Sequence, residues 1–220
     1  MQSPNIICHE LLSFHIDDLE TVRQAFQTAA PCVTQQAWLA KPEPDFLPAV
    51  VRTGWRNDAL LVFAELPDAD IFTRATTLNE RMWELGDVFE IFLRPVEQVP
   101  YLEFHVTPNN QRLQLRIANA ESYNIVKNTG SITHALVPGD AFCSMAWACP
   151  EIKKWFAYAE IPAKSVCDEV KPLSGCQWLF SFSRYDYTRG REKPVISSTS
   201  AHVEPKFHHQ QDWGALNFRA

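Results

Sequence analysis

The sequence lacks the features that mark several classes of protein. No apolar run approaches the roughly 20 residues that a membrane-spanning helix needs, so we expect no membrane partner. The net charge is −6 without a basic block, which argues against a nucleic-acid partner, since such partners select a basic face. The six cysteines form no CxxC pair or zinc-ligand spacing, and no P-loop, dinucleotide fingerprint or Gly-x-Ser-x-Gly elbow is present.

The N-terminal stretch MQSPNIICHELLSF also lacks the basic region and the continuous apolar core of a signal peptide. We therefore expect either an intracellular protein or a secreted protein from which a signal has been removed. The sequence does not decide between these two locations.

Glycine is scarce, with seven residues, whereas the chain has 15 prolines, 14 phenylalanines and seven tryptophans. This balance is typical of many short strands joined by rigid turns. The composition, 46% apolar and 21% charged, is that of an ordinary globular protein. No repeat, low-complexity segment or linker divides the chain, so we expect one domain over residues 1–220.

The stretch MWELGDVFEIFL, residues 82–93, contains the strand around which we expect the fold to be built. Between residues 87 and 93 both side-chain faces are mostly apolar, which is typical of a central strand covered on both sides. Glu90 is a carboxylate inside this run. Because burying an unpaired carboxylate costs several kcal/mol, roughly, we expect Glu90 to bind a ligand or to pair with Arg116 or Arg184.

Other segments carry strand patterns as well. Residues 101–107 and 112–117 alternate between apolar and polar side chains, which predicts adjacent antiparallel strands. We expect Glu103, His105, Gln114 and Arg116 to lie together on one polar, solvent-exposed face. Residues 49–53 and 59–66 form a predicted hairpin around the turn at 55–58. Further strands are predicted at 33–39, 141–149, 154–161 and 177–186, with a helix at 17–30 and a short helical turn at 162–170. Together these elements predict an all-β fold, a two-sheet antiparallel β-sandwich of the jelly-roll sort with one or two short helices.

Four motifs in this order, WELGDVFEIFL, YLEFHVTPNN, LFSFSRYDY and PKFHHQQDWGALNF, resemble those of the family 9 carbohydrate-binding modules. The resemblance covers roughly residues 50 to 220. It implies a non-catalytic β-sandwich module that binds mono- or oligosaccharides and is associated with polysaccharide degradation. In this family a sugar ring is held between two aromatic side chains, and charged residues bind its hydroxyls.

The resemblance also implies a set of ligand-binding residues. Trp83 stands at the first aromatic position and Glu90 at the carboxylate that follows it, with one extra residue between them. Phe207 stands where the family has a second tryptophan. His105 stands where the family has a basic side chain, and Arg116 and Arg184 are further candidates for that role.

These residue types suit a saccharide, because pyranose C–H faces pack on aromatic rings and paired hydroxyls match carboxylate and guanidinium groups. Calcium occurs in the family, but the sequence suggests only Asp68 and Asp70 as ligands, and we expect no cofactor to be required.

Three other readings of the sequence remain open. Trp83 is a large aromatic that also suits a place in the core. A jelly-roll glycoside hydrolase would need two nearby carboxylates, for which Glu90 and Glu103 qualify if their strands are neighbours, whereas Asp87 and Glu90 should face opposite sides. A protein-interaction domain with a filled sugar groove would show the same strand pattern.

Overall fold

The computed structural model describes residues 2–169 and 172–220 of the chain. The strands are β1 (Asn5–His9), β2 (Cys32–Val33), β3 (Val50–Arg56), β4 (Ala59–Pro67), β5 (Val88–Pro95), β6 (Tyr101–Val106), β7 (Arg112–Ile117), β8 (Cys143–Cys149), β9 (Lys154–Pro162), β10 (Gln177–Asp186), β11 (Val195–Ser198) and β12 (Gly214–Arg219). The helices are α1 (Leu19–Ala25), α2 (Ala120–Thr129) and α3 (Ala163–Val166), with short 3₁₀ turns η1 (Met82–Glu84), η2 (Thr133–Ala135), η3 (Pro150–Ile152) and η4 (Gln210–Asp212).

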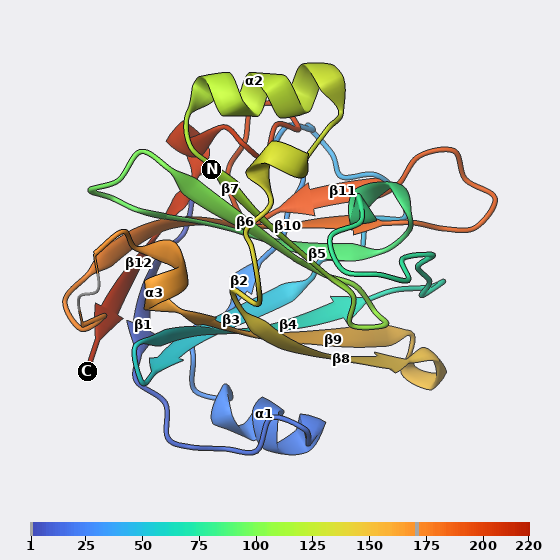
Figure 1. Cartoon of the computed structure of the whole chain (residues 1–220). Coiled ribbons are helices and arrows are strands. Elements are labelled where there is room, and N and C mark those ends of the chain that lie inside the picture. Colours follow the sequence, from blue (N-terminus) through green and yellow to red (C-terminus); the bar gives the residue numbers. More distant parts are fainter. Residues whose placement is uncertain (1, 170–171) are drawn as a thin grey trace.

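The strands form two sheets that stack as a sandwich (Figure 1). The seven-stranded sheet has the order β1-β12-β10-β5-β6-β7, with β11 paired to β10, and the five-stranded sheet has the order β2-β3-β4-β9-β8. The predicted sandwich is therefore confirmed. One pair departs from the antiparallel prediction, because β1 runs parallel to β12 at the edge of the larger sheet.

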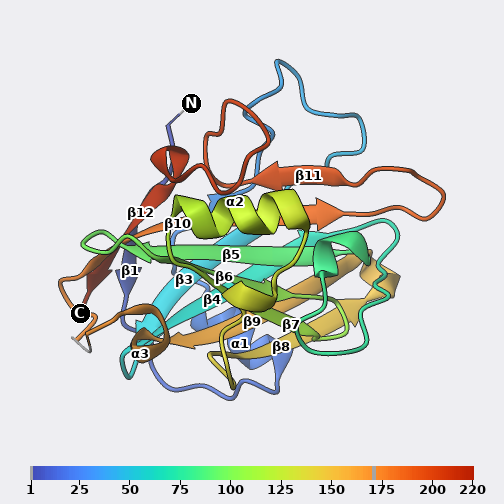
Figure 2. The same ribbon diagram turned by 45° about the horizontal axis from the view of Figure 1, so that its top comes forward.

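Apolar side chains fill three layers rather than one. The main core lies between the two sheets, a second cluster covers the outer face of the seven-stranded sheet, and a third lies between α1 and the five-stranded sheet. Helix α2 crosses the outer face of the seven-stranded sheet, which becomes clear when the molecule is turned (Figure 2). The larger sheet is thus covered on both sides.

The predicted central strand is confirmed. Strand β5 pairs with β10 on one side and with β6 on the other. Its inner face carries Phe89, Ile91 and Leu93 into the main core, while Val88 and Phe92 belong to the outer cluster. This double cover explains why both faces of the segment are apolar.

Local sequence signals account for several other elements. Asn57 and Asp58 adopt φ angles of 51° and 54°, so the predicted β3–β4 hairpin closes through a two-residue turn that suits these residue types. The predicted helix at 17–30 is present but shorter, as α1, with Asp18 accepting a hydrogen bond from the Glu20 backbone N–H as its N-cap.

Two elements differ from the prediction. The strand expected at 33–39 is confined to Cys32–Val33, and the chain then turns where the Gln36 side chain bonds to Glu43 and to the Ile196 carbonyl. Helix α2 was not predicted. The helical turn expected at 162–170 is present as α3, although Val170 at its end lies outside the described residues.

The prediction that β6 and β7 share one polar, solvent-exposed face is wrong. Glu103 pairs with Leu115 and His105 with Leu113, whereas Gln114 pairs with Phe104 and Arg116 with Leu102. Paired residues of antiparallel strands point to the same side, so Glu103 and His105 face outward while Gln114 and Arg116 face the inter-sheet side. Strand β6 is also buried along its whole length, so its outer face is not solvent-exposed.

Candidate functional site

The β5–β6 register brings charged side chains together on the outer face of the seven-stranded sheet. Glu90 pairs directly with His105, and Glu103 pairs with Phe92 on the same face. All three charged side chains are buried, with exposed fractions of 3% for Glu90, 4% for Glu103 and 0% for His105. We call Glu90, Glu103 and His105 the outer-face cluster.

The imidazole of His105 lies between the two carboxylates. Its Nε2 is 2.6 Å from Glu103 Oε1 and 3.4 Å from Glu90 Oε1. On the far side of Glu103, His208 Nδ1 lies 3.8 Å from Oε2, and it also bonds to the Tyr101 hydroxyl at 2.7 Å. Buried charged groups need such partners, because an uncompensated charge in the interior is strongly destabilising.

All three side chains of the outer-face cluster have shifted pKa values. Burial, with the nearby Glu103 carboxylate, raises the pKa of Glu90 to about 8 despite the opposing effect of His105. Burial also opposes ionisation of Glu103, but His208 and the hydrogen bond from His105 outweigh it and lower its pKa. For His105, the two carboxylates outweigh the effect of burial and raise the pKa. Glu90 therefore keeps its proton at neutral pH, and the shifts of Glu103 and His105 both favour an ion pair between these two side chains.

Trp83 lies over this cluster. The η1 turn presents its ring edge-on to His105, with the ring centroids 5.6 Å apart and the planes at 70°. The Arg81 guanidinium stacks on the same indole at 5.4 Å, and the Tyr187 hydroxyl anchors the Trp83 carbonyl at 2.6 Å. Trp83 is only partly buried, which leaves part of its surface open to solvent.

Arg184 lies on the opposite face of the sheet. It pairs in register with Phe89, and its guanidinium contacts Asp68 at 3.0 Å and Asp186 at 3.2 Å inside the sandwich. Arg116 also points away from the outer-face cluster and pairs with Asp168 at 2.5 Å. The predicted pairing of Glu90 with either arginine is therefore wrong, since Glu90 has His105 as its partner.

Phe207 shares the outer side of the sheet with Trp83 but is a packed residue. It is 4% exposed, and its ring contacts Trp38, Tyr185 and His202. A sugar ring can stack on Phe207 only if these neighbours move. The structure thus brings Glu90 and His105 together beneath Trp83 and places Phe207 within the cluster of apolar side chains that surrounds them.

Two groups of side chains have the donor types that calcium or another cation would use. The oxygens of Asp68, Asp87 and Asp186 lie within 4.8 Å of one another, as do the ligand atoms of the outer-face cluster. Each group already contains its own cation, however. Arg184 lies between Asp68 and Asp186, and the raised pKa of His105 favours an imidazolium.

Hydrogen bonds further reduce the fit to calcium. Asp87 accepts bonds from the Phe72 and Tyr187 backbone N–H groups, and Asp70 pairs with Arg189. Calcium takes six to eight oxygen ligands. The residues present fit internal ion pairs better than a calcium site, and Asp68 and Asp70 do not form a shared ligand set around an open position.

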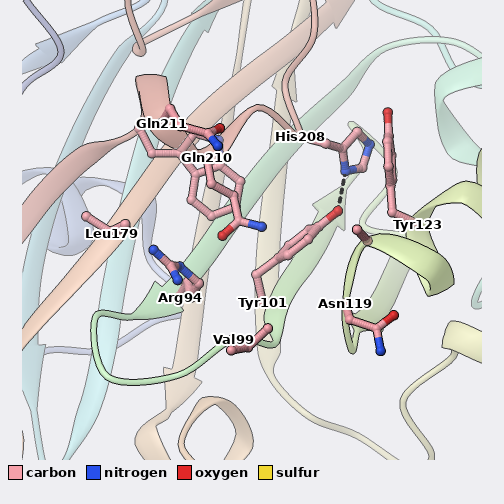
Figure 3. Close-up of a pocket in the computed structure, with 11 residues that line it drawn as sticks. Arg94, Val99, Tyr101, Asn119, Tyr123, Leu179, His208, Gln210 and Gln211 are labelled. Carbon is pink, nitrogen blue, oxygen red and sulfur yellow. Dashed lines mark hydrogen bonds between the residues drawn. The ribbon is translucent and has the colours of Figure 1, made fainter.

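A cavity of about 570 Å³ opens on the same side of the sheet as the outer-face cluster. Figure 3 shows Arg94, Gln210 and Gln211 on one side of Tyr101, and Asn119, Tyr123 and His208 on the other. His208 joins the cavity to the cluster, because it lines the cavity and approaches Glu103. Sequence reasoning missed this cavity, although most of its C-terminal residues lie in the motif PKFHHQQDWGALNF.

The cluster also bears on the hydrolase alternative. Oxygens of Glu90 and Glu103 lie within 4.8 Å of each other, as neighbouring strands allow, while Asp87 belongs to a separate buried group. A glycoside hydrolase needs both carboxyl groups to reach the scissile bond. Here His105 lies between them and both are at most 4% exposed, an arrangement that suits a structural ion pair better than catalysis.

Comparison with solved structures identifies the fold. A candidate carbohydrate-binding protein from Bacteroides uniformis superposes with a TM-score of 0.72 at 15% identity, covering 99% of this chain and 100% of that chain. Two structures of a family 9 carbohydrate-binding module from Caldicellulosiruptor kristjanssonii also match at 15% identity. The match to its complex with cellotriose has a TM-score of 0.65 and covers 99% of this chain and 94% of that chain. The match to its complex with glucose has a TM-score of 0.64 and covers 99% of this chain and 96% of that chain.

No protein-family model matches the chain, and no curated protein matches it in sequence. The structural matches are therefore evidence about the fold. They show a β-sandwich whose fold is like that of the family 9 carbohydrate-binding modules. Within the described residues, no helix is long and apolar enough to cross a membrane.

Proposed function

We propose that this domain binds saccharides without catalysis on the outer face of the seven-stranded sheet. The observation that carries the proposal is the partly exposed Trp83 ring in contact with the buried outer-face cluster. Its fold is that of modules whose structures hold cellotriose and glucose, which supports a saccharide as the ligand class. Association with polysaccharide degradation is part of the same proposal.

The proposed site works through one aromatic surface and a fixed set of hydrogen-bonding groups. A pyranose ring packs its C–H face on the exposed part of Trp83, and the buried cluster beneath holds that indole in place. Glu90 and Glu103 are at most 4% exposed, so they bond to sugar hydroxyls only if the side chains that cover them move. His105 Nδ1 is buried without a hydrogen-bond partner among the described residues, and the same movement would let a sugar hydroxyl bond to it.

In this proposal the other predicted site residues have supporting roles. Phe207 packs beside Tyr185 and helps to shape the outer face. Arg184 holds the carboxylates on the inter-sheet side, and Arg116 pairs with Asp168 at the surface. The family pattern of two rings around one sugar is thus proposed here in a reduced form, with Trp83 as the exposed ring.

Replacing Trp83 with alanine should remove most of the saccharide binding. If packing on the indole contributes about 1.4 kcal/mol, near the upper end for a contact with one aromatic ring, its loss raises the Kd for cellotriose about 10-fold. Isothermal titration calorimetry with cellotriose and glucose measures this change. The matched control is Trp147→Ala, which removes a partly buried tryptophan from β8 on the other sheet.

Each outcome of this titration has a clear meaning. Loss of binding in Trp83→Ala with normal binding in Trp147→Ala supports the proposal, provided that both variants keep the wild-type circular dichroism spectrum. Equal binding by the two variants contradicts the role of Trp83. Release of shorter sugars from cellotriose during the titration would favour the glycoside hydrolase alternative instead.

A further inference from the structure

The cavity of Figure 3 is separate from the surface under Trp83. Its lining includes Tyr101 and Trp213, which are 3% and 6% exposed and meet edge to face with ring centroids 5.4 Å apart. Its walls come from the β5 and β6 ends, the start of α2 and the segment around η4. Neither Trp83 nor Glu90 lines it, although His208, which lines it, also approaches Glu103 of the outer-face cluster.

The lining is suited to a sugar ring. Tyr123 packs against His208 with ring centroids 4.5 Å apart and the planes tilted by 40°, and it is only partly buried, so part of its aromatic surface remains open. Three amide side chains, Asn119, Gln210 and Gln211, also line the cavity. Amides both donate and accept hydrogen bonds, which matches the mixed donor and acceptor character of sugar hydroxyls. A volume of about 570 Å³ lies in the usual range of small-ligand sites.

The charge of the lining is unusual for this acidic chain. The whole chain has 26 acidic residues against 20 basic ones, yet no carboxylate of the described residues lines the cavity. Arg94 lines it, and one of its terminal nitrogens donates to the Gln98 carbonyl at 3.0 Å. The Arg94 Nε is buried and has no hydrogen-bond partner among the described residues. The terminal nitrogens of this guanidinium, rather than the buried Nε, are the donors that an anionic group in the cavity would use.

The start of α2 adds to the positive potential. Asn119 is the N-cap of this ten-residue helix, and both Asn119 and Ala120 line the cavity. Helix N-termini favour negative charge. Three carboxylates lie near these residues but do not line the cavity: Glu121 in the first turn of α2, Glu103 beyond His208, and Asp212, which pairs with His202 and His209.

We infer that this cavity is a second saccharide subsite that takes an acidic sugar, with the carboxylate of a uronic acid bound by Arg94. The inference rests on the proposed saccharide-binding function and names a ligand class for a different part of the same face. The sugar ring lies against Tyr123, and the amide side chains bind its hydroxyls. The uronate carboxylate takes the place between Arg94 and the start of α2.

The test uses two probes that differ at one carbon. Methyl β-D-glucuronoside carries a carboxylate where methyl β-D-glucoside carries a hydroxymethyl group. We expect the wild-type protein to bind the glucuronoside at least about 10-fold more tightly in calorimetry, with the preference falling as salt rises. Arg94→Gln should remove the preference, and Arg94→Lys should keep part of it because the charge remains.

A second variant tests the same subsite without changing Arg94, so its result does not depend on how the arginine variants fold. Asn119→Asp keeps a good N-cap for α2 but adds a negative charge at the rim, so it should weaken glucuronoside binding more than glucoside binding. The matched control is Arg23→Gln, which removes a partly exposed arginine from α1 on the other side of the molecule. It should bind both probes like the wild type.

The outcomes separate this inference from the proposed function. Equal binding of the two probes, or a preference that survives in Arg94→Gln and Asn119→Asp, overturns the acidic subsite. If cellotriose binds and the glucuronoside does not, the inference fails while the proposed function stands. If neither probe nor cellotriose binds, both fail.

Discussion

Replacing Arg184 with methionine should lower the free energy of unfolding by about 3–5 kcal/mol, because it removes one partner of a buried ion cluster. Arg184 is 1% exposed, and its guanidinium contacts Asp68, Asp186 and the Pro67 carbonyl. Without it, the buried carboxylates must either lose their compensating charge or take up protons. Equilibrium unfolding in urea at pH 8, followed by tryptophan fluorescence, measures the effect.

The matched control is Arg189→Met. Arg189 also pairs with an aspartate, Asp70, but its side chain is 63% exposed. Exposed ion pairs contribute about 0–1 kcal/mol, so this variant should unfold almost like the wild type. If both variants lose a similar, small amount of unfolding free energy, the buried cluster does not depend on Arg184.

The second large expected effect is a fall in the free energy of unfolding as the pH rises. Glu90 has a pKa of about 8 in the folded protein against an ordinary value of 4.5. Between these values the unfolded chain has lost the proton and the folded chain has kept it, so stability falls as pH rises by up to about 1.4 kcal/mol per pH unit for this group. Asp87, with a pKa of about 8, and Asp186, with a pKa of about 7, act in the same direction.

Glu103 and His105 also contribute to the pH dependence of stability, Glu103 on the acidic side and His105 on the basic side. The lowered pKa of Glu103 gives stability that is present above its ordinary value and lost as the pH falls through its folded value. The raised pKa of His105 gives stability that is present below its ordinary value and lost as the pH rises through its folded value. Wild-type stability should therefore decline from about pH 5 to pH 8.

Glu90→Gln should flatten this decline, because glutamine has nearly the shape of the protonated acid and cannot ionise. The variant should resemble the wild type near pH 5 and become the more stable protein by pH 8. Urea unfolding at half-unit pH steps checks the slopes. The control is Glu84→Gln, which removes an exposed carboxylate paired with Arg81 and should keep the wild-type slope. A Glu90→Gln slope equal to that of the wild type would contradict the assignment.

The sequence predicts elements whose signals are local. The double apolar pattern around Glu90 identifies β5 as central, and the Asn57–Asp58 pair identifies the β3–β4 turn. Helix α2 has comparable local signals, since Asn119 caps its start and Gly130 ends it with a φ of 69°. It was missed because its apolar side chains form a weak stripe, and none of its residues is buried.

Register and partner choice depend on longer-range information. The turn between β6 and β7 spans residues 107–111, so Val106 pairs with Arg112. That five-residue connection sets Glu103 opposite Leu115, whereas a four-residue connection would have set it opposite a polar position. The partner of Glu90 depends in the same way on the β5–β6 register, which places His105 opposite it.

Arg184 shows a different limit of sequence reasoning. In the motif LFSFSRYDY it follows Phe180 and Phe182 on the face that points into the main core, while Ser181 and Ser183 share the face of Glu90. An arginine on an apolar face is unexpected until the aspartates that meet it are known. Asp68 comes from the end of a strand in the other sheet, which no local pattern connects to β10.

A nuclear magnetic resonance titration of the ¹⁵N-labelled protein with cellotriose tests the central claim most directly, because it reports where the ligand binds. Saccharide binding on the outer face of the seven-stranded sheet predicts the largest shift changes at the Trp83 indole N–H and at backbone amides of η1, β5 and β6. The amides of β3, β4 and β9 in the other sheet should remain unchanged. Saturating cellotriose that shifts no resonance, or shifts confined to the five-stranded sheet, would contradict the account.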